Sequence, residues 1–419
     1  MKISHMDPDV MTSIIKKLEA VFAKDAPLTI QRGKKLDYLG MDLDFSEKGR
    51  VGIVMVKSIK VMLQDVSEDM NGWTNTPAAT YMFETNKSAE KLTKKEAQFL
   101  HTTTAKMLFM CKRARPDIQT AVSFLCTRVK EPDCDDYKKL RRAIRYLRKT
   151  TNLAMRLQIT DMTVIKWWVD ASFAVHPNMR GHTGGVMMMG KGAIIATSTK
   201  QKLNTRSSTE SELVGAHDVM PIAMWTKYFI EAQGYQIKQS IMYQDNKSCI
   251  LMENNGRASS SKRTKHINVR YFFITDRIAK GDIEIVYCPT NDMVADFFTK
   301  PLQGKLFKKF ICQIMNIELD DPILRPAQDH RSVLEKETKP SLNKKEIGQT
   351  VGRDKTEIGQ TAERNKLNIS RTVPRQSFSI QNNKTNDKTN KNNVCTYADV
   401  LRTGRKVSRS KKDFRTLYG

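Results

Sequence analysis

The chain has 419 residues and a formal net charge of +26, so it exceeds one typical domain of about 100–200 residues. A charge of that size favours nucleic acid as a partner over an anionic membrane surface. No apolar run approaches the roughly 18 residues that a membrane-spanning helix needs, and no signal peptide is visible. The seven cysteines include no CxxC pair, which predicts a reduced, intracellular protein, cytoplasmic or nuclear and not secreted.

Residues 1–90 predict a small α+β piece. A helical pattern, VMTSIIKKLEAVFA, precedes two strand-like runs, DYLGMDLDF and RVGIVMVKSIKVML. Between residues 91 and 160, apolar residues recur at helical spacing in three stretches, the last of which is basic and amphipathic. We therefore expect a helical connector there.

Residues 161–318 alternate between strand and helix patterns. They open with the strand TVIKWWVD and a hairpin that turns at Gly190 to Gly192. A hairpin followed by alternating strands and helices indicates the α/β class, with a mixed sheet covered by helices. Pro221 interrupts the helix that begins near Ser208, so we expect a kink or an end near Met220.

Residues 319–419 are rich in Asn, Lys, Thr and Gln and poor in aromatic residues. The fragment KEIGQTVGRDK recurs as TEIGQTAERNK, starting at Lys345 and Thr356, and both copies are too polar to build a core. This pattern predicts a disordered basic tail. Its basic cluster from Arg402 to Arg415 is either a nuclear address or a solvated tail.

The stretch RSSTESELVGA carries two glutamates, Glu210 and Glu212, where a helix begins. Capping does not distinguish them, because a helix that starts at Ser207 or at Thr209 makes one or the other the N3 residue of a capping box. Residues advance by about 100° around a helix, which puts Glu212 on the face that packs on the sheet. A carboxylate there is costly unless it is paired or bound to a cation. From the helix alone, a ligand and a partly exposed glutamate stay equally open.

Three further carboxylates lie at the ends of predicted elements. Asp170 closes IKWWVD, Asp245 closes IMYQD, and Asp296 follows EIVYCP in the first turns of a helix. Carboxylates at neighbouring strand ends can converge, and like charges so close together require a cation. Each Asp alone is more often a cap or a surface residue. The ordered set, with no His or Cys ligands nearby, favours Mg²⁺ or Mn²⁺ over zinc.

Six long motifs occur in one order: DYLGMDL (37–43), ARPDIQTAVSFL (114–125), SSTESEL (207–213), YQDNKSCI (243–250), KRTKHINVRYFF (262–273) and YCPTNDMVADFFTKPL (287–302). On these motifs, residues 1–312 resemble the C-terminal part of copia-type retrotransposon polyproteins, the end of the reverse transcriptase followed by the ribonuclease H domain. The resemblance implies a ribonuclease H-like α/β fold, a five-stranded mixed sheet flanked by helices, with an acidic cleft for two divalent ions.

The resemblance also implies roles for individual residues. Its four acidic positions fall on Asp170, Glu212, Asp245 and Asp296, which selects Glu212 in agreement with the helical face and leaves Glu210 as a cap. The implied activity is hydrolysis of the RNA strand of an RNA–DNA hybrid with two Mg²⁺ or Mn²⁺ ions per site. Candidate substrate contacts are Thr205, Ser207, Ser208, Asn246, Lys262, Arg263, Lys265 and His266. For the basic run Lys262 to His266, a solvated helix start is an equally open interpretation.

Reverse transcriptases need a Tyr-x-Asp-Asp hairpin, and the sequence has none. We therefore expect residues 1–90 to be a truncated C-terminal piece of a reverse transcriptase, with no DNA synthesis by this chain alone and a polymerase-containing portion of the same polyprotein as a possible partner. Two alternatives remain. One is an integrase-type strand transferase, which usually carries a zinc-binding His/Cys module that is absent here. The other is an inactive remnant that only binds nucleic acid.

Overall fold

The computed structural model describes residues 3–325 except residues 4, 6, 25 and 257–267. All of these residues belong to one compact unit, Met1–Thr338. From residue 326 onward, the predicted tail lies outside the described residues. This part of the chain includes the tandem fragments and the basic cluster from Arg402 to Arg415. No helix among the described residues is long and apolar enough to cross a membrane.

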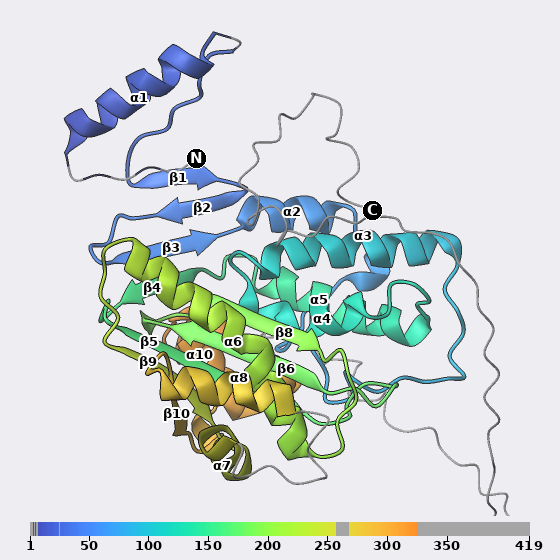
Figure 1. Ribbon diagram of the computed structural model, residues 1–419. Helices are drawn as coiled ribbons and strands as arrows, with labels where there is room; N and C mark the ends of the chain where they lie inside the picture. Colours follow the sequence, from blue (N-terminus) through green and yellow to red (C-terminus); the bar gives the residue numbers. More distant parts are fainter. Residues whose placement is uncertain (1–2, 4, 6, 25, 257–267, 326–419) are drawn as a thin grey trace, which may run out of the picture. The chain divides into compact units, whose positions relative to one another are not determined.

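A five-stranded mixed sheet, here called the second sheet, carries the alternating part of the chain (Figure 1). Its order is β10-β9-β5-β6-β8; β5 pairs antiparallel with β6, and β6 with β8, whereas β9 is parallel to both β5 and β10. The prediction of the α/β class, with a five-stranded mixed sheet flanked by helices, is confirmed. The strands are β5 (Val164–Ser172), β6 (His182–Met188), β8 (Ile195–Lys200), β9 (Gln239–Gln244) and β10 (Glu284–Tyr287).

Helices pack against this sheet as the pattern predicts. The long helix α6 (Ser208–Ala232) contacts β5 and β6, and α8 (Asn268–Ala279) lies beside it (Figure 1). The short helix α9 (Asp296–Thr299) contacts β5, β6 and β8, and α4 (Gln119–Cys126) contacts both β8 and α9. Helix α7 (Lys247–Asn255) contacts α6 and α8.

Two adjacent glycines in β6 let helices approach both faces of the sheet. A Cβ on Gly184 would lie 2.7 Å from Thr299 Cγ2 and 2.9 Å from the carbonyl oxygen of Ala295, next to α9. A Cβ on Gly185 would lie 2.9 Å from Val219 Cγ2, on α6. Because successive residues of a strand point to opposite faces, α9 and α6 lie on opposite sides of β6.

Of the kink or end expected near Met220, the end is excluded, because α6 continues through Pro221 to Ala232. Proline removes one backbone donor from the helix. The residues that follow it, Ala223 and Met224, are buried in the core beneath the helix together with Met220. This apolar packing on both sides of the proline holds the helix together past the missing hydrogen bond.

An antiparallel first sheet contains strands of the N-terminal part, of the connector and, in β7, of the alternating part of the chain, in the order β1-β2-β3-β4-β7. The run RVGIVMVKSIKVML was predicted as a strand throughout, and this is wrong for its second half, which forms α2 (Val56–Gln64). Ile59 and Met62 are its buried residues, three positions apart as on a helix face. The strands are β1 (Lys35–Tyr38), β2 (Met41–Asp44), β3 (Arg50–Val54), β4 (Met155–Ile159) and β7 (Gly190–Lys191).

One apolar core joins the connector to the C-terminal helix of the unit. It includes Met62, Leu125, Leu147, Phe310 and Leu324, all buried. By contrast, α1 (Pro8–Phe22) has no buried residue. The remaining helices are α3 (Lys94–Cys111), α5 (Cys134–Lys149), α10 (Gly304–Met315) and the 3₁₀ turns η1 (Glu68–Met70), η2 (Pro116–Ile118), η5 (Thr290–Asp292) and η6 (Pro322–Leu324).

Candidate metal centre

Asp170 lies near the C-terminal end of β5, opposite Gly184 in the ladder with β6. Its side chain is almost fully buried, with 2% of the residue exposed. Oδ2 accepts a hydrogen bond from the hydroxyl of Thr299, and Oδ1 lies 3.6 Å from Nζ of Lys300. Both oxygens of this carboxylate therefore face groups from the segment around α9.

Glu212 reaches the same place from α6. Gly215, one turn further along, permits a close approach, because a Cβ there would lie 3.1 Å from Cβ of Ala171 on β5. Oε2 of Glu212 accepts the backbone N–H of Ala171 at 3.0 Å. The side chain thus points to the sheet, as the helical phase predicts.

Glu210 has a different set of partners at the start of α6. Ser207 is the N-cap, and its hydroxyl accepts the backbone N–H of Glu210 at 3.2 Å. Oε2 of Glu210 accepts the N–H of Arg206 at 2.8 Å, one residue before the N-cap. Glu210 is also buried, with 8% exposed, so burial alone does not separate the two glutamates; their hydrogen bonds do.

Asp245 directly follows β9, the parallel neighbour of β5. Because parallel neighbours end on the same side of a sheet, its carboxylate meets that of Asp170. Asp170, Glu212 and Asp245 each offer an oxygen such that all three atoms lie within 4.8 Å of one another. We call these residues the acidic triad. Oδ2 of Asp245 also accepts the hydroxyl of Thr290 at 3.0 Å.

Asp296 is the first residue of α9 and is 3% exposed. It is not a member of the acidic triad. Its Oδ1 lies 2.7 Å from Nζ of Lys300, the same ammonium that approaches Asp170. The structure thus brings three predicted carboxylates directly together and connects the fourth to them through a lysine.

The electrostatics of this group follow from burial and from like charges. Burial raises the pKa of Asp170, raises that of Glu212 well above its ordinary value, and raises that of Asp296 to about 7. Neighbouring carboxylates add to the rise for Glu212 and Asp296. Burial also opposes the charge on Lys300, but Asp170 and Asp296 outweigh it, so the pKa of Lys300 is raised. A cation among these carboxylates would offset their repulsion.

The acidic triad suits a hard divalent cation. Its donors are carboxylate oxygens, without thiol or imidazole ligands, which favours Mg²⁺ or Mn²⁺. The N–H of Ala171 and the hydroxyls of Thr290 and Thr299 orient the three carboxylates. Such outer contacts fix the direction of ligand oxygens.

The predicted substrate contacts have mixed outcomes. Ser207 and Ser208 are exposed at the start of α6, and Oγ1 of Thr205 is buried without a hydrogen-bond partner in the described part of the chain. The side chain of Asn246 caps α7 by accepting the N–H of Cys249 at 3.0 Å. The other four residues lie outside the described residues: Lys262, Arg263, Lys265 and His266.

Two residues of the site, Thr299 and Lys300, were not predicted. They follow Asp296 by three and four positions, a spacing that places side chains on one face of a helical turn. That spacing in ADFFTK was a usable signal. The hydrogen bond from Thr299 to Asp170 was not, because it joins segments that are far apart in the sequence.

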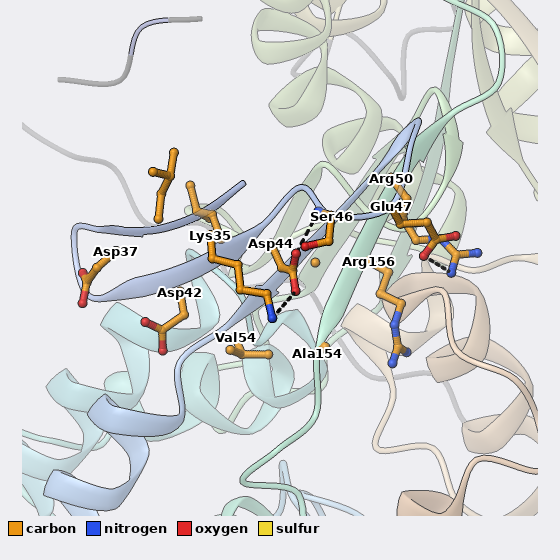
Figure 2. Close-up of a pocket in the computed structure, with 13 residues that line it drawn as sticks. Lys35, Asp37, Asp42, Asp44, Ser46, Glu47, Arg50, Val54, Ala154 and Arg156 are labelled. Carbon is orange, nitrogen blue, oxygen red and sulfur yellow. Dashed lines mark hydrogen bonds and ion pairs between the residues drawn. The ribbon is translucent and has the colours of Figure 1, made fainter. Parts of the chain in front are cut away.

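A pocket of about 640 Å³ lies on the first sheet, and Figure 2 shows its charged lining. Lys35 pairs there with Asp44 at 3.7 Å, and Arg50 pairs with Glu47 at 3.0 Å. No residue of the acidic triad lines this pocket. These charges pair with one another, and the pocket is separate from the acidic triad.

Comparison with known proteins supports the predicted resemblance, although no family model matches the chain. The retrovirus-related Pol polyprotein from transposon TNT 1-94 of Nicotiana tabacum is 30% identical over 195 residues, 46% of this chain. The corresponding polyprotein from transposon RE1 of Arabidopsis thaliana is 30% identical over 202 residues, 48% of this chain. Each match covers only 14% of the relative's length. The resemblance to copia-type retrotransposon polyproteins is confirmed.

Solved structures with similar folds include ribonucleases H. LC11-RNase H1, isolated from compost, is 11% identical, with a TM-score of 0.25 over 32% of this chain and 91% of that chain. The same protein in complex with an RNA/DNA hybrid is 12% identical, with a TM-score of 0.25 over 32% of this chain and 92% of that chain. The N-terminal ribonuclease H domain of a Mycobacterium tuberculosis protein is 10% identical, with a TM-score of 0.23 over 33% and 91%.

Proposed function

We propose that this chain is a divalent-metal-dependent ribonuclease that hydrolyses the RNA strand of RNA–DNA hybrids. The observation that carries the proposal is the acidic triad, whose three oxygens lie within 4.8 Å of one another although Asp170 and Glu212 are almost fully buried. The similarity to copia-type retrotransposon polyproteins supports RNA–DNA hybrids as the substrate class. The five-stranded mixed sheet supports a ribonuclease H-like fold.

The residues of the chain have separate tasks in this proposal. Asp170, Glu212 and Asp245 hold Mg²⁺ or Mn²⁺, which supplies the Lewis-acid chemistry of phosphodiester hydrolysis. Ala171 fixes Glu212 through its N–H, and Thr299 fixes Asp170 through its hydroxyl. These bonds keep the carboxylates in place while substrate binds and leaves.

Recognition of the hybrid rests on its backbone. The net charge of +26 favours binding to phosphates, and 2′-hydroxyls in a shallow minor groove distinguish RNA from DNA. The exposed hydroxyls of Ser207 and Ser208 stand at the start of the helix that carries Glu212. Because phosphates and 2′-hydroxyls are the same at every nucleotide of the RNA strand, we expect little sequence preference. A polymerase-containing portion of the same polyprotein would supply the hybrid.

The second candidate is a protein that binds nucleic acid without cleaving it. The same net charge favours it, because charge alone supports non-specific binding. The two candidates differ in what they require of the acidic triad, since binding through phosphate contacts needs no buried carboxylates.

The test is a cleavage assay with end-labelled substrates. The purified chain is incubated with an RNA–DNA hybrid, the same RNA as a single strand, and the matching DNA duplex, each with Mg²⁺, with Mn²⁺ and with a chelator. We expect cleavage of the hybrid's RNA strand only, and none with the chelator. Hybrid binding without cleavage under any condition would favour the second candidate and contradict the first.

A further inference from the structure

Lys300 stands between two carboxylates that come from different elements. Its Nζ lies 2.7 Å from Oδ1 of Asp296 on α9 and 3.6 Å from Oδ1 of Asp170 on β5. The side chain is 39% exposed, whereas those of Asp170 and Asp296 are 3% and 4% exposed. The ammonium therefore reaches from the surface into the space between two buried anions.

The backbone around Lys300 is held from three directions. The carbonyl of Phe297 accepts the hydroxyl of Thr120 at 2.7 Å, that of Phe298 accepts Ser198 at 2.7 Å, and that of Thr299 accepts Ser172 at 3.2 Å. These donors come from α4, β8 and β5. Three consecutive carbonyls just before Lys300 are thus tied to other elements, so the lysine enters the site from a fixed point.

The positions of the charges divide the site in two. One part is the acidic triad, in which Glu212 accepts the N–H of Ala171 and which suits a divalent ion. The other part is the pair Asp170 and Asp296, which shares Asp170 with the triad and already has a cation in Lys300. A second divalent ion bound to both carboxylates of that pair would share their space with the ammonium, and like charges at such distances repel strongly.

We infer that the ammonium of Lys300 supplies the second positive charge of the site, so that the protein binds one divalent ion, at Asp170, Glu212 and Asp245. The inference rests on the proposed function and refines it, because the family resemblance alone implies two divalent ions. Lys300 acts here as a positioning residue. Its ammonium offsets the repulsion between the carboxylates of Asp296 and Asp170 and leaves the acidic triad to the metal.

The test counts bound ions directly. The full chain is titrated with Mn²⁺, and bound Mn²⁺ is measured from the loss of the free-ion signal in electron paramagnetic resonance. We expect one ion per chain for the natural protein and two for Lys300→Met, in which a neutral side chain of similar length frees the pair. Two ions that share Asp170 would also show an exchange-coupled spectrum, present in Lys300→Met and absent from the natural protein.

Two further variants serve as controls. Lys300→Arg keeps the charge and should keep one ion per chain. Lys309→Met removes a lysine that is 40% exposed and pairs with Asp292 at 2.7 Å, outside the acidic site, and it should also keep one. The inference is overturned if the natural protein binds two ions or none. This result does not depend on whether Lys300→Met folds.

The count is independent of the cleavage assay. If the natural protein cleaves the hybrid but binds two ions, the inference fails and the proposed function stands. If no variant cleaves while the count rises from one to two in Lys300→Met, the proposed function fails and the role of Lys300 stands.

Discussion

Gly184 lies directly opposite Asp170 in the ladder between β5 and β6, and Thr299 fills the space that its missing side chain leaves. The contact joins the strand to α9 at the point where Thr299 donates its hydroxyl to Asp170. A side chain at position 184 would therefore displace the group that orients the central carboxylate.

The first prediction concerns Gly184→Ala. The new Cβ would lie 2.9 Å from the carbonyl oxygen of Ala295, a backbone atom that moves only with α9. We expect a loss of about 1–3 kcal/mol of unfolding free energy from overpacking, together with slower cleavage of the hybrid. Urea unfolding and initial rates measure the two effects. The control is Gly52→Ala in β3, where a Cβ would lie 3.8 Å from its nearest neighbour; equal losses in both variants would argue against a special role for Gly184.

The two glutamates of α6 provide the second prediction. Glu212→Gln keeps the shape of the side chain but removes a metal ligand, so we expect cleavage to fall by at least about 100-fold without a loss of stability. Glu210→Gln weakens the contact with the N–H of Arg206 at the start of the helix, so it should cost about 1 kcal/mol or less and spare activity. Rates and thermal melts of both variants would show this. Reversed phenotypes would mean that Glu210 holds the metal.

Two buried histidines predict how stability depends on pH. Nε2 of His176 lies 2.9 Å from Nδ1 of His182, whose Nε2 lies 2.7 Å from Oγ of Ser198. Burial lowers the pKa of His176 to about 4 and that of His182 to about 3, and in each case Lys200 adds to the effect. Both rings are therefore neutral in the folded protein under conditions in which the unfolded chain, with a histidine pKa near 6.5, begins to take up protons.

The sign follows from this difference. The contribution of the two histidines to stability is complete above about pH 6.5 and falls as the pH drops from there toward 3, because the unfolded chain binds the protons. For His182 the loss approaches about 1.4 kcal/mol per pH unit. Urea unfolding between pH 7 and 4 measures the slope, and His182→Gln should flatten it. An unchanged slope in that variant would show that other groups control the acid sensitivity.

A buried ion pair in the connector gives a further prediction. Arg115 and Asp117 pair at 2.8 Å, and both side chains are 0% exposed. The guanidinium also donates to the carbonyl of Thr150 at 3.0 Å. Asp117→Asn leaves a buried positive charge without its counter-ion, so we expect a loss of about 3–5 kcal/mol in urea unfolding.

The exposed pair of Asp65 and Lys106 serves as the control for that prediction. Asp65→Asn should cost about 1 kcal/mol or less, because solvent screens such pairs. A small loss in Asp117→Asn would mean that the connector rearranges or admits water around Arg115.

Sequence patterns predicted the part of the fold that has strong periodicity. The strand that ends near Asp170 and the helix that begins at Ser208 could be located because apolar residues recur there with a clear period. The face of Glu212 followed from helical geometry alone. The predicted domain boundaries at residues 90, 160 and 318 stay predictions, and one core contains residues from both sides of each.

The remaining features depend on contacts between distant segments. The strand β4 is short and pairs with β3 across about a hundred residues, and no local pattern reveals such a partner. The second half of RVGIVMVKSIKVML is a short apolar run, which fits strand and helix equally well. Lys300 was overlooked for a related reason: its importance comes from Asp170, which lies on another element.

The central claim is that the acidic triad performs metal-dependent cleavage, and one comparison of rates tests it most directly. Initial rates of RNA cleavage in an RNA–DNA hybrid with Mg²⁺ are measured for the natural protein, for Asp170→Asn and for Asp292→Asn, an exposed carboxylate that pairs with Lys309 outside the triad. We predict that only Asp170→Asn loses cleavage while remaining folded. Equal rates for the natural protein and Asp170→Asn would contradict the claim.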